Sequence, residues 1–501
     1  MINKTFLPLI VASLPAVLRA ADATPPATRP NIVFILIDDL PYAGLSVTGN
    51  PYLQTPNMDR LAKEGMFFTR AYAEPICGPS RASLMTGQFA GRHGRTDNVP
   101  GSHPRALMQE PLLPLKPDVN PSLHFDLIQT TRLPDPVQPG TYSLITALRN
   151  GGYRTAISGK WHLPGLYLSP AKAREYGFDF CNRTANGGRP YKDTENFTSE
   201  AIRFLRENGN QNFFLYLAYH AVHGPHVVPP EDRQRWQERL QGKNPGIPLE
   251  MLATLEFVDL SVGRVLDALD ELGLADNTLV VLASDNGGEG RAMYSEANKP
   301  FRQGKGTHYE GGVRVPAFIR WPGKIAPGTR CDVPVSFVDF FPTFCEVAGV
   351  TADPDHQFDG VSIKPLFTGG TLPERSLFFH YPHYLSYYAA TPVRTVVQGR
   401  YKLVWNPYDH IVVDGDRPAE RSLKYVAAPR IELFDLQNDP GEHQNLTQQH
   451  PEKVEEMCRL YEGWMKETGA RDVTPNPDYD PADPLFNARE AYLEKMKGKS
   501  K

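Results

Sequence analysis

The stretch Asn31-Ile-Val-Phe-Ile-Leu-Ile37, followed at once by Asp38-Asp39, decides the fold of this chain. Residues 32–37 are apolar without interruption and rich in β-branched side chains, which is typical of a strand buried on both faces of its sheet. In parallel sheets, ligands gather beyond the carboxyl ends of the strands. The two aspartates therefore stand where a binding site would be expected.

The alternation of strand and helix continues to about residue 350. Further apolar strand patterns cover residues 67–72, 153–158, 213–219, 279–283 and 315–321. Helical patterns cover residues 57–66, 142–150, 199–207, 249–272 and 338–348. Strands separated by helices indicate a large, mostly parallel mixed sheet with helices on both faces. We therefore predict an α/β domain over residues 30–370.

The pattern changes after about residue 370. Short strand patterns cover residues 377–381, 393–397, 401–405 and 431–435, and an amphipathic helical pattern follows at 452–466. We predict a smaller C-terminal α+β domain with a short antiparallel sheet over residues 371–470, and an extended tail over 471–501. Residues 98–139 are rich in proline and leucine without periodicity, which predicts a long surface excursion near the mouth of a pocket.

Composition narrows the possible partners and the compartment. The net charge of the 501 residues is −4 and no block of like charge stands out, which argues against nucleic acid or an anionic membrane as a partner. Lys4, an apolar run over 5–18 and small residues up to Ala23 predict a signal peptide over residues 1–23, and hence export. No later apolar run is long enough to span a membrane. Five cysteines without a Cys-x-x-Cys pair disfavour structural zinc, and nothing indicates an oligomeric state.

Residues 77–87, Cys-Gly-Pro-Ser-Arg-Ala-Ser-Leu-Met-Thr-Gly, form the second informative stretch. Pro79 suits the first turn of a helix and Gly87 suits its end, so Cys77 should lie at a helix N-terminus. Arg81 lies four residues on and can face the same way. The local pattern leaves two interpretations open: a thiol activated by the helix dipole, and a buried structural thiol beside an arginine.

Other polar residues follow the predicted strands. Asp38-Asp39 and Asp285-Asn286 offer only oxygen ligands, which favours a hard cation such as Ca²⁺ or Mg²⁺. In Gly159-Lys-Trp-His162 the side chains of Lys160 and His162 would share a face, one suited to bind an anion and the other to act as acid or base. The glycine-rich residues 302–312 leave Lys305 room to approach an anion.

Cys-x-Pro-Ser-Arg followed by Leu-Met-Thr-Gly closely resembles the signature of the type I sulfatases, which have an alkaline-phosphatase-like fold. The acidic pairs, Gly159–His162, residues 220–226, the Lys305 loop and Ile431–Leu446 resemble further elements of that family, in the family order. The resemblance implies that a maturation enzyme oxidises Cys77 to formylglycine, whose hydrated aldehyde attacks the sulfur of a sulfate ester. It also implies a single Ca²⁺, or Mg²⁺, held by the group Asp38, Asp39, residue 77, Asp285 and Asn286.

The same resemblance implies roles for the remaining residues. Arg81 would stabilise the nucleophile and Asp285 would accept its proton. The sulfate oxygens would be bound by Lys160, Lys305 and His223. His223 would protonate the leaving oxygen and His162 would deprotonate the remaining hydroxyl of the hydrate. Glu310 would support the Lys305 loop.

Two alternatives remain at the level of sequence. One is a formylglycine-dependent phosphonate monoester hydrolase or phosphodiesterase of the same fold; two-zinc relatives are disfavoured because Asn286 stands where those enzymes usually have histidine. The other is a non-catalytic, glycan-binding descendant. Export and the long excursion suggest a sulfated carbohydrate rather than a small aryl sulfate as substrate. The candidates for binding it are His226, His380 and His383, although the residues around 380 could equally pack between the domains.

Overall fold

A computed structural model describes residues 29–98, 125–126, 136–182, 190–288, 295–382, 391–408, 410–414, 422–426, 428–472 and 474–475. Its main feature is a nine-stranded sheet in the order β10-β2-β8-β7-β1-β6-β4-β5, with β9 also paired to β2. The predicted signal peptide and almost all of the predicted excursion over 98–139 lie outside the described residues.

The predicted strand at 31–37 is the centre of this sheet. β1 (Asn31–Ile37) pairs in parallel with β6 (Phe213–Tyr219) on one side and with β7 (Thr278–Ser284) on the other, and every residue of the three strands is buried. β6 pairs in parallel with β4 (Arg154–Gly159), and β4 with β5 (Phe180–Cys181). The prediction of a strand buried on both faces is confirmed.

The other half of the sheet is mixed in direction. β8 (Arg314–Arg320) runs antiparallel to both β7 and β2 (Met66–Tyr72). β9 (Thr329–Cys331) and β10 (Val335–Ser336) then pair in parallel with β2. The sheet is therefore mostly parallel but mixed, as predicted.

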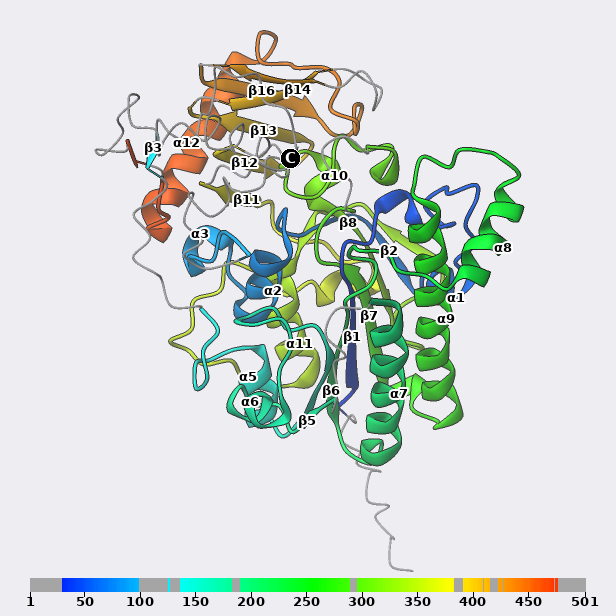
Figure 1. Ribbon diagram of the computed structural model, residues 1–501. Coiled ribbons are helices and arrows are strands. Elements are labelled where there is room, and N and C mark those ends of the chain that lie inside the picture. The colour runs from blue at the N-terminus through cyan, green and yellow to red at the C-terminus, as the bar shows by residue number, and fades with distance from the viewer. Residues whose placement is uncertain are drawn as a thin grey trace, which may run out of the picture.

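Helices cover both faces of the sheet (Figure 1). Alternate residues of β1 face opposite layers: Val33, Ile35 and Ile37 pack in one hydrophobic cluster, and Ile32, Phe34 and Leu36 in the other. The first layer contains α1 (Pro56–Glu64), α7 (Pro190–Asn208), α8 (Pro230–Leu240) and α9 (Leu249–Glu271). The second contains α2 (Cys77–Thr86), α5 (Leu144–Asn150), α6 (Pro170–Glu175) and α11 (Phe340–Ala348).

One helix begins earlier than the sequence predicts. The apolar pattern indicated a helix over 199–207, whereas α7 starts at Pro190. Its first turns contain Asp193, Thr194 and Thr198, which are polar yet fully buried. Burial of polar residues leaves no apolar periodicity, which is why the pattern missed this part of the helix.

The C-terminal region, β11 to α12, has its own sheet. β11 (Ser376–Tyr381), β12 (Val393–Gln398), β13 (Tyr401–Asn406) and β16 (Arg430–Asp435) form an antiparallel sheet in that order. α12 (Pro451–Thr468) packs on it through Met457, Tyr461 and Trp464. The predicted strands and helix are confirmed, whereas the hairpin of β14 (His410–Asp414) and β15 (Ser422–Val426) and the pair of β3 (Phe125–Asp126) and β17 (Thr474–Pro475) were not predicted.

Two short helices, α3 (Ala90–His93) and α10 (Glu310–Val313), connect the main sheet to the C-terminal region. Figure 1 shows α10 between β8 and the strands β12 and β13. Within the described part of the chain, no helix has both the length and the apolar character needed to cross a membrane.

Candidate active site

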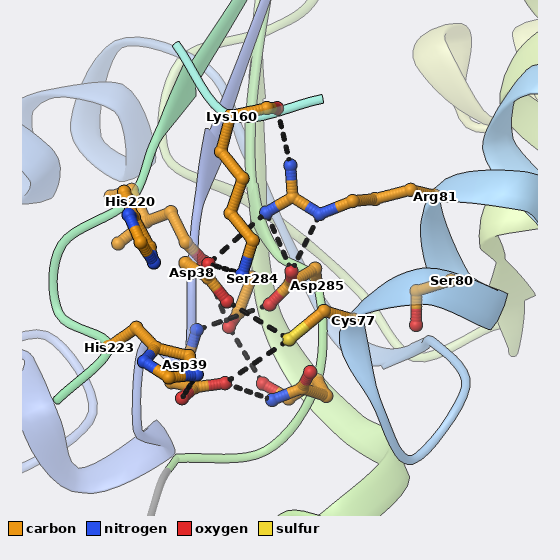
Figure 2. Close-up of polar contacts among 12 residues, drawn as sticks. Asp38, Asp39, Cys77, Ser80, Arg81, Lys160, His220, His223, Ser284 and Asp285 are labelled. Carbon is orange, nitrogen blue, oxygen red and sulfur yellow. Dashed lines mark hydrogen bonds and ion pairs between the residues drawn. The ribbon is translucent and has the colours of Figure 1, made fainter. Parts of the chain in front are cut away.

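The candidate site lies at the carboxyl ends of the central parallel strands (Figure 2). Asp38 and Asp39 follow β1, and Asp285 and Asn286 follow β7, whose last residue is in register with the last residue of β1. Lys160 follows β4, and His220 follows β6. Parallel register thus brings residues that are far apart in sequence to one edge of the sheet.

Helix α2 points its first residue into this edge. Cys77 is the first residue of α2, and Gly87 ends the helix in the left-handed conformation at φ 66°, as predicted. The Cys77 Sγ lies 3.2 Å from Asp38 Oδ1 and 3.9 Å from Asp39 Oδ1. Ser80, on the same helix, turns away from the cluster and donates to the Glu74 and Ile76 carbonyls. The thiol therefore faces the carboxylates, and the serine secures the start of the helix.

The acidic residues are grouped tightly enough to hold one cation. Asp38, Asp39, Cys77 and Asp285 are buried, and each offers a ligand atom within 4.8 Å of the others. Asn286 Nδ2 donates to Asp39 Oδ1 at 2.6 Å, while the buried Asn286 Oδ1 has no hydrogen-bond partner among the residues that the structure describes. A buried carbonyl oxygen without a donor, beside carboxylates, fits a hard cation such as Ca²⁺ or Mg²⁺.

Three buried cations face the three carboxylates. Arg81 donates through Nη2 to Asp285 Oδ2 at 2.8 Å and through Nη1 to the Lys160 carbonyl at 2.7 Å. Lys160 Nζ forms an ion pair with Asp38, and Lys305 Nζ lies 2.7 Å from Asp39. All three cationic side chains are almost completely buried, so their charges act with little screening by water. The sequence-predicted Lys160, Lys305 and Arg81 are thus brought together.

This environment disfavours an activated thiol at Cys77. Burial and the nearby Asp285 and Asp38 raise the pKa of the Cys77 thiol well above its usual value, despite Lys160 and Lys305. Burial also works against ionisation of Asp38, but Lys160 and Arg81 lower the pKa of that carboxyl well below its usual value. The helix N-terminus alone would favour a thiolate, and the surrounding carboxylates outweigh it.

The two predicted catalytic histidines differ in exposure. The His223 side chain is 29% exposed, and its Nε2 lies 3.9 Å from Asp39 Oδ2. Its Nδ1–H donates to the Gly224 carbonyl at 2.7 Å, which turns Nε2 toward the cluster. His162 has a φ of 62°, and within the described part of the chain its buried Nδ1 has no hydrogen-bond partner. Burial, together with Lys160 and Arg81, lowers the pKa of His162, so its ring is neutral.

The three residues suggested for substrate binding have different outcomes. His226 lies on the same loop as His223 and is partly exposed. His380 is 3% exposed; its Nδ1 contacts the Tyr461 hydroxyl at 2.7 Å, and its Nε2 contacts the Arg471 carbonyl. The alternative of packing is therefore the one that the structure shows for His380, and the suggested sugar contact is corrected. His383 lies outside the described residues.

Two further groups lie near the site: His220, which the sequence places with His223 just past a strand end without a catalytic role, and Arg95, which was not predicted. His220 directly follows β6; its ring centroid is 5.3 Å from that of His223, and its Nδ1 contacts the Tyr167 hydroxyl. Arg95 donates through Nη2 to the His162 carbonyl at 3.0 Å and to the Asn98 carbonyl at 2.7 Å. A Cβ at Gly78 would lie 2.9 Å from Arg95 Nε, so the glycine after Cys77 leaves room for this arginine. Gly78 was the one feature of the sequence that could have indicated a close neighbour of this kind.

Comparison with known proteins assigns the family. The family model described as Sulfatase matches residues 30–350, and one described as N-sulphoglucosamine sulphohydrolase, C-terminal, matches residues 303–414. The chain belongs to the sulfatase family. It is 32% identical to arylsulfatase A of Homo sapiens, with 84% of each chain covered, and 30% identical to N-acetylgalactosamine-6-sulfatase of Mus musculus, with 87% of this chain and 84% of that relative covered. It is also 30% identical to steryl-sulfatase of Mus musculus, covering 94% of this chain and 87% of the relative.

Solved structures share the fold of this sulfatase. Ps i-CgsB, in complex with k-i-k-neocarrahexaose, superimposes with a TM-score of 0.67 at 24% identity, covering 94% of this chain and 99% of that one. The phosphonate monoester hydrolase of Agrobacterium radiobacter gives a TM-score of 0.58 at 20% identity, covering 88% and 96%. The resemblance to the formylglycine-dependent sulfatases and the alkaline-phosphatase-like fold are confirmed, and the protein is a sulfuric ester hydrolase.

Proposed function

We propose that this sulfatase hydrolyses sulfate esters of carbohydrates, using a formylglycine formed from Cys77 and a single Ca²⁺. The observation that carries the proposal is the buried cluster at the strand ends, where residue 77 meets three carboxylates and three cations. Asp38, Asp39, Asp285 and Asn286 would hold the ion with residue 77. The ion would supply Lewis-acid charge, and the hydrated aldehyde of residue 77 a nucleophilic oxygen and an exit for the sulfate.

Binding of the sulfate group would fall to the lysines. The ammonium groups of Lys160 and Lys305 enter the cluster from different loops, and each is close to a carboxylate of the proposed metal site. Positive charges fixed around a transferring anion stabilise its transition state, and they act most strongly where water is excluded. Arg81, held between Asp285 and the Lys160 carbonyl, would stabilise negative charge on the nucleophilic oxygen.

The two histidines suit opposite proton transfers. His223 is partly exposed and directs Nε2 toward the cluster. Because its Nδ1–H is bound to the Gly224 carbonyl, Nε2 carries a proton in the imidazolium form, and in that form it would donate the proton to the oxygen of the departing alcohol. His162 is neutral and has an unpartnered Nδ1, so it can accept the proton whose removal releases sulfate. The proposed acid, His223, is thus partly exposed, and the proposed base, His162, lies in the interior.

The proposal includes a carbohydrate substrate and export of the protein. The relative named N-acetylgalactosamine-6-sulfatase indicates a sugar by its name, whereas the equally similar steryl-sulfatase indicates a steroid, so family membership leaves the alcohol open. The N-terminal pattern over residues 1–23 supports export, where sulfated polysaccharides are met. N-terminal sequencing of the mature protein from its native host tests export: removal of these residues is expected, and retention in active protein would contradict it.

A substrate panel tests the reaction and its specificity. Turnover is measured on sulfated mono- and oligosaccharides, an aryl sulfate, a phosphonate monoester and a phosphodiester, with Lys160→Met as the control for anion binding. We expect the highest kcat/KM on a sulfated sugar, and a loss of about 10²-fold or more in Lys160→Met. Preference for the phosphonate or the phosphodiester would favour the alternative hydrolase, and activity on aryl sulfate alone would contradict the carbohydrate assignment.

A further inference from the structure

We infer that Lys402 and Glu442 of the C-terminal region are positioning residues for catalysis, because they fix the loop that carries Lys305 into the active site. The inference rests on the proposed role of Lys305 as a sulfate ligand. The side chains of Lys402 and Glu442 contact each other and Glu310, and among the described residues neither contacts the cluster around Cys77, so we expect them to act on turnover through the loop.

The Lys305 loop, residues 302–312, is held by close backbone contacts with itself and with the segment before Cys77. The Gly311 N–H donates to the Arg302 carbonyl at 2.9 Å, and the Gly306 N–H donates to the Pro75 carbonyl at 2.8 Å. A Cβ at Gly311 would lie 2.3 Å from the Gln303 carbonyl oxygen. Backbone approaches this close are possible only at glycine, and they leave the loop little room to deform.

The far end of this loop is an ion-pair cluster shared between the two sheets. Lys402 Nζ, on β13, lies 2.9 Å from Glu310 Oε1 and 2.9 Å from Glu442 Oε1, and all three side chains are completely buried. The other oxygen of Glu310 accepts from the Tyr72 hydroxyl and from Arg314 Nη1, each at 3.1 Å. We call Glu310, Arg314, Lys402 and Glu442 the cross-sheet cluster.

Glu442 contacts the backbone of the loop in addition to forming an ion pair with Lys402. Its Oε2 accepts the Glu310 N–H at 2.6 Å, which is where the loop enters α10. Its carbonyl accepts from Arg302 Nη1 at 3.3 Å, at the other end of the loop. One residue of the C-terminal region thus contacts both ends of the segment that carries Lys305.

Further contacts from the C-terminal strands restrain the same loop. His308 Nδ1 lies 3.0 Å from Thr395 Oγ1 on β12, and the Tyr309 hydroxyl donates to Glu432 on β16. Figure 1 shows the loop's helix, α10, directly against this sheet. Lys305 is only five residues from Glu310. The Lys305 backbone N–H donates to the carbonyl of Gly288, which follows Asn286 by two residues. A shift of the cross-sheet cluster would therefore move the Lys305 ammonium relative to the proposed metal ligands.

A charge-balanced variant separates positioning from folding. Lys402→Met alone leaves two buried glutamates opposite one arginine, and it could fail to fold for that reason. Lys402→Met/Glu442→Gln removes one charge of each sign and leaves Glu310 paired with Arg314. The matched control is Glu455→Gln/Arg459→Met, which removes an exposed ion pair of α12 in the same region.

The decisive readout is whether the effect depends on Lys305. In the folded holoenzyme, with a sulfate ester as substrate, we expect Lys402→Met/Glu442→Gln to lower kcat/KM about 10²-fold. We expect it to weaken inhibition by inorganic sulfate, whereas the control pair changes neither. In a Lys305→Met background the same two substitutions should cause little further loss, because the group that they position is gone.

Two results would overturn the inference. One is wild-type kcat/KM and sulfate inhibition in the folded double variant. The other is an equal further loss in the Lys305→Met background, which would show that the two residues act by another route. Full turnover by Lys305→Met itself would instead contradict the proposed role of Lys305, so failure of the proposed function is distinguishable from failure of this inference.

Discussion

Two buried clusters of charge lie at opposite ends of the segment from Lys305 to Glu310, and they are built differently. The active-site cluster joins three carboxylates and three cations from helix α2 and from the segments that follow β1, β4 and β7. It includes the partly exposed His223 and the Asn286 Oδ1, which has no hydrogen-bond partner among the described residues. The cross-sheet cluster pairs two carboxylates with two cations, and none of its residues is more than 9% exposed. The active-site cluster thus has a partly exposed residue and an amide oxygen that could bind an ion, whereas every carboxylate oxygen of the cross-sheet cluster lies close to a cation or to a hydrogen-bond donor.

The two clusters make different contributions to the protein. Buried ion pairs cost desolvation, so they give geometry more than stability, and removing one partner is expensive. The active-site cluster uses that geometry to bind an ion and an anion. The cross-sheet cluster uses it to hold the loop between the two sheets. Substitutions in the first should therefore change activity more than stability, and substitutions in the second should change both.

Cys77→Ala should have the largest effect, and mainly on activity. It removes the side chain that we propose as the source of the nucleophile, and loss of the nucleophile lowers kcat by about 10⁶-fold in a serine protease. Loss of one small buried side chain should cost about 1 kcal/mol of unfolding free energy. Turnover of a sulfate ester and urea unfolding measure the two effects, and substantial remaining turnover would refute the role of residue 77.

Lys402→Met should mainly affect stability. The unpaired charge that it leaves among Glu310, Glu442 and Arg314 should cost about 3–5 kcal/mol of unfolding free energy. The charge-balanced Lys402→Met/Glu442→Gln should recover most of that loss, because no excess charge remains. Urea unfolding of both variants measures this effect. Equal unfolding free energies for Lys402→Met and the wild type would contradict the role of Lys402 in the cross-sheet cluster.

Removal of the metal should abolish activity and lower stability to a moderate degree. An ion that binds only the folded state stabilises it by about 2.7 kcal/mol when present at a hundred times its Kd. A Ca²⁺ chelator should therefore lower the melting temperature and abolish turnover, and Asp39→Asn should no longer respond to it. Restoring Ca²⁺ or Mg²⁺ separately identifies the ion, and a wild-type protein indifferent to chelation would contradict the metal assignment.

Glu74 is a buried carboxyl outside both clusters, and it provides the smallest test. It accepts from the Ala90 N–H rather than from a cation, and burial raises its pKa to about 8. The folded state therefore keeps a proton that the unfolded state releases near its usual pKa, so stability falls as pH rises through this window. Glu74→Gln should remove that slope and gain about 2 kcal/mol relative to wild type between about pH 5 and pH 7. The same pH dependence of the unfolding free energy in the wild type and in Glu74→Gln would contradict this prediction.

The sequence predicted the parts of the site that follow buried strands. Residues 32–37 identify β1, so Asp38 could be placed at a strand end, and Asp285 followed in the same way from β7. The glycine after α2 fixed the end of that helix. These elements were predictable because burial on both faces and helix termination leave strong local patterns.

What the sequence could not predict depends on contacts between distant segments. The choice between sugar contact and packing stayed open for His380 because a strand pattern does not reveal that Tyr461 of α12 contacts its ring. Arg95 was missed because its contact with the His162 carbonyl joins segments that show no shared pattern. The pairing of Lys402 with Glu310 joins two different sheets, and only the folded chain brings them together.

The central claim is that the nucleophile arises from Cys77, and the mass of one peptide tests it most directly. Trypsin should release residues 71–81, Ala-Tyr-Ala-Glu-Pro-Ile-Cys-Gly-Pro-Ser-Arg, from active protein made in its native host. The account predicts a peptide that is lighter by the replacement of the thiol with an aldehyde and that reacts with a hydrazide probe. An unmodified thiol at residue 77 throughout fully active protein would contradict the account.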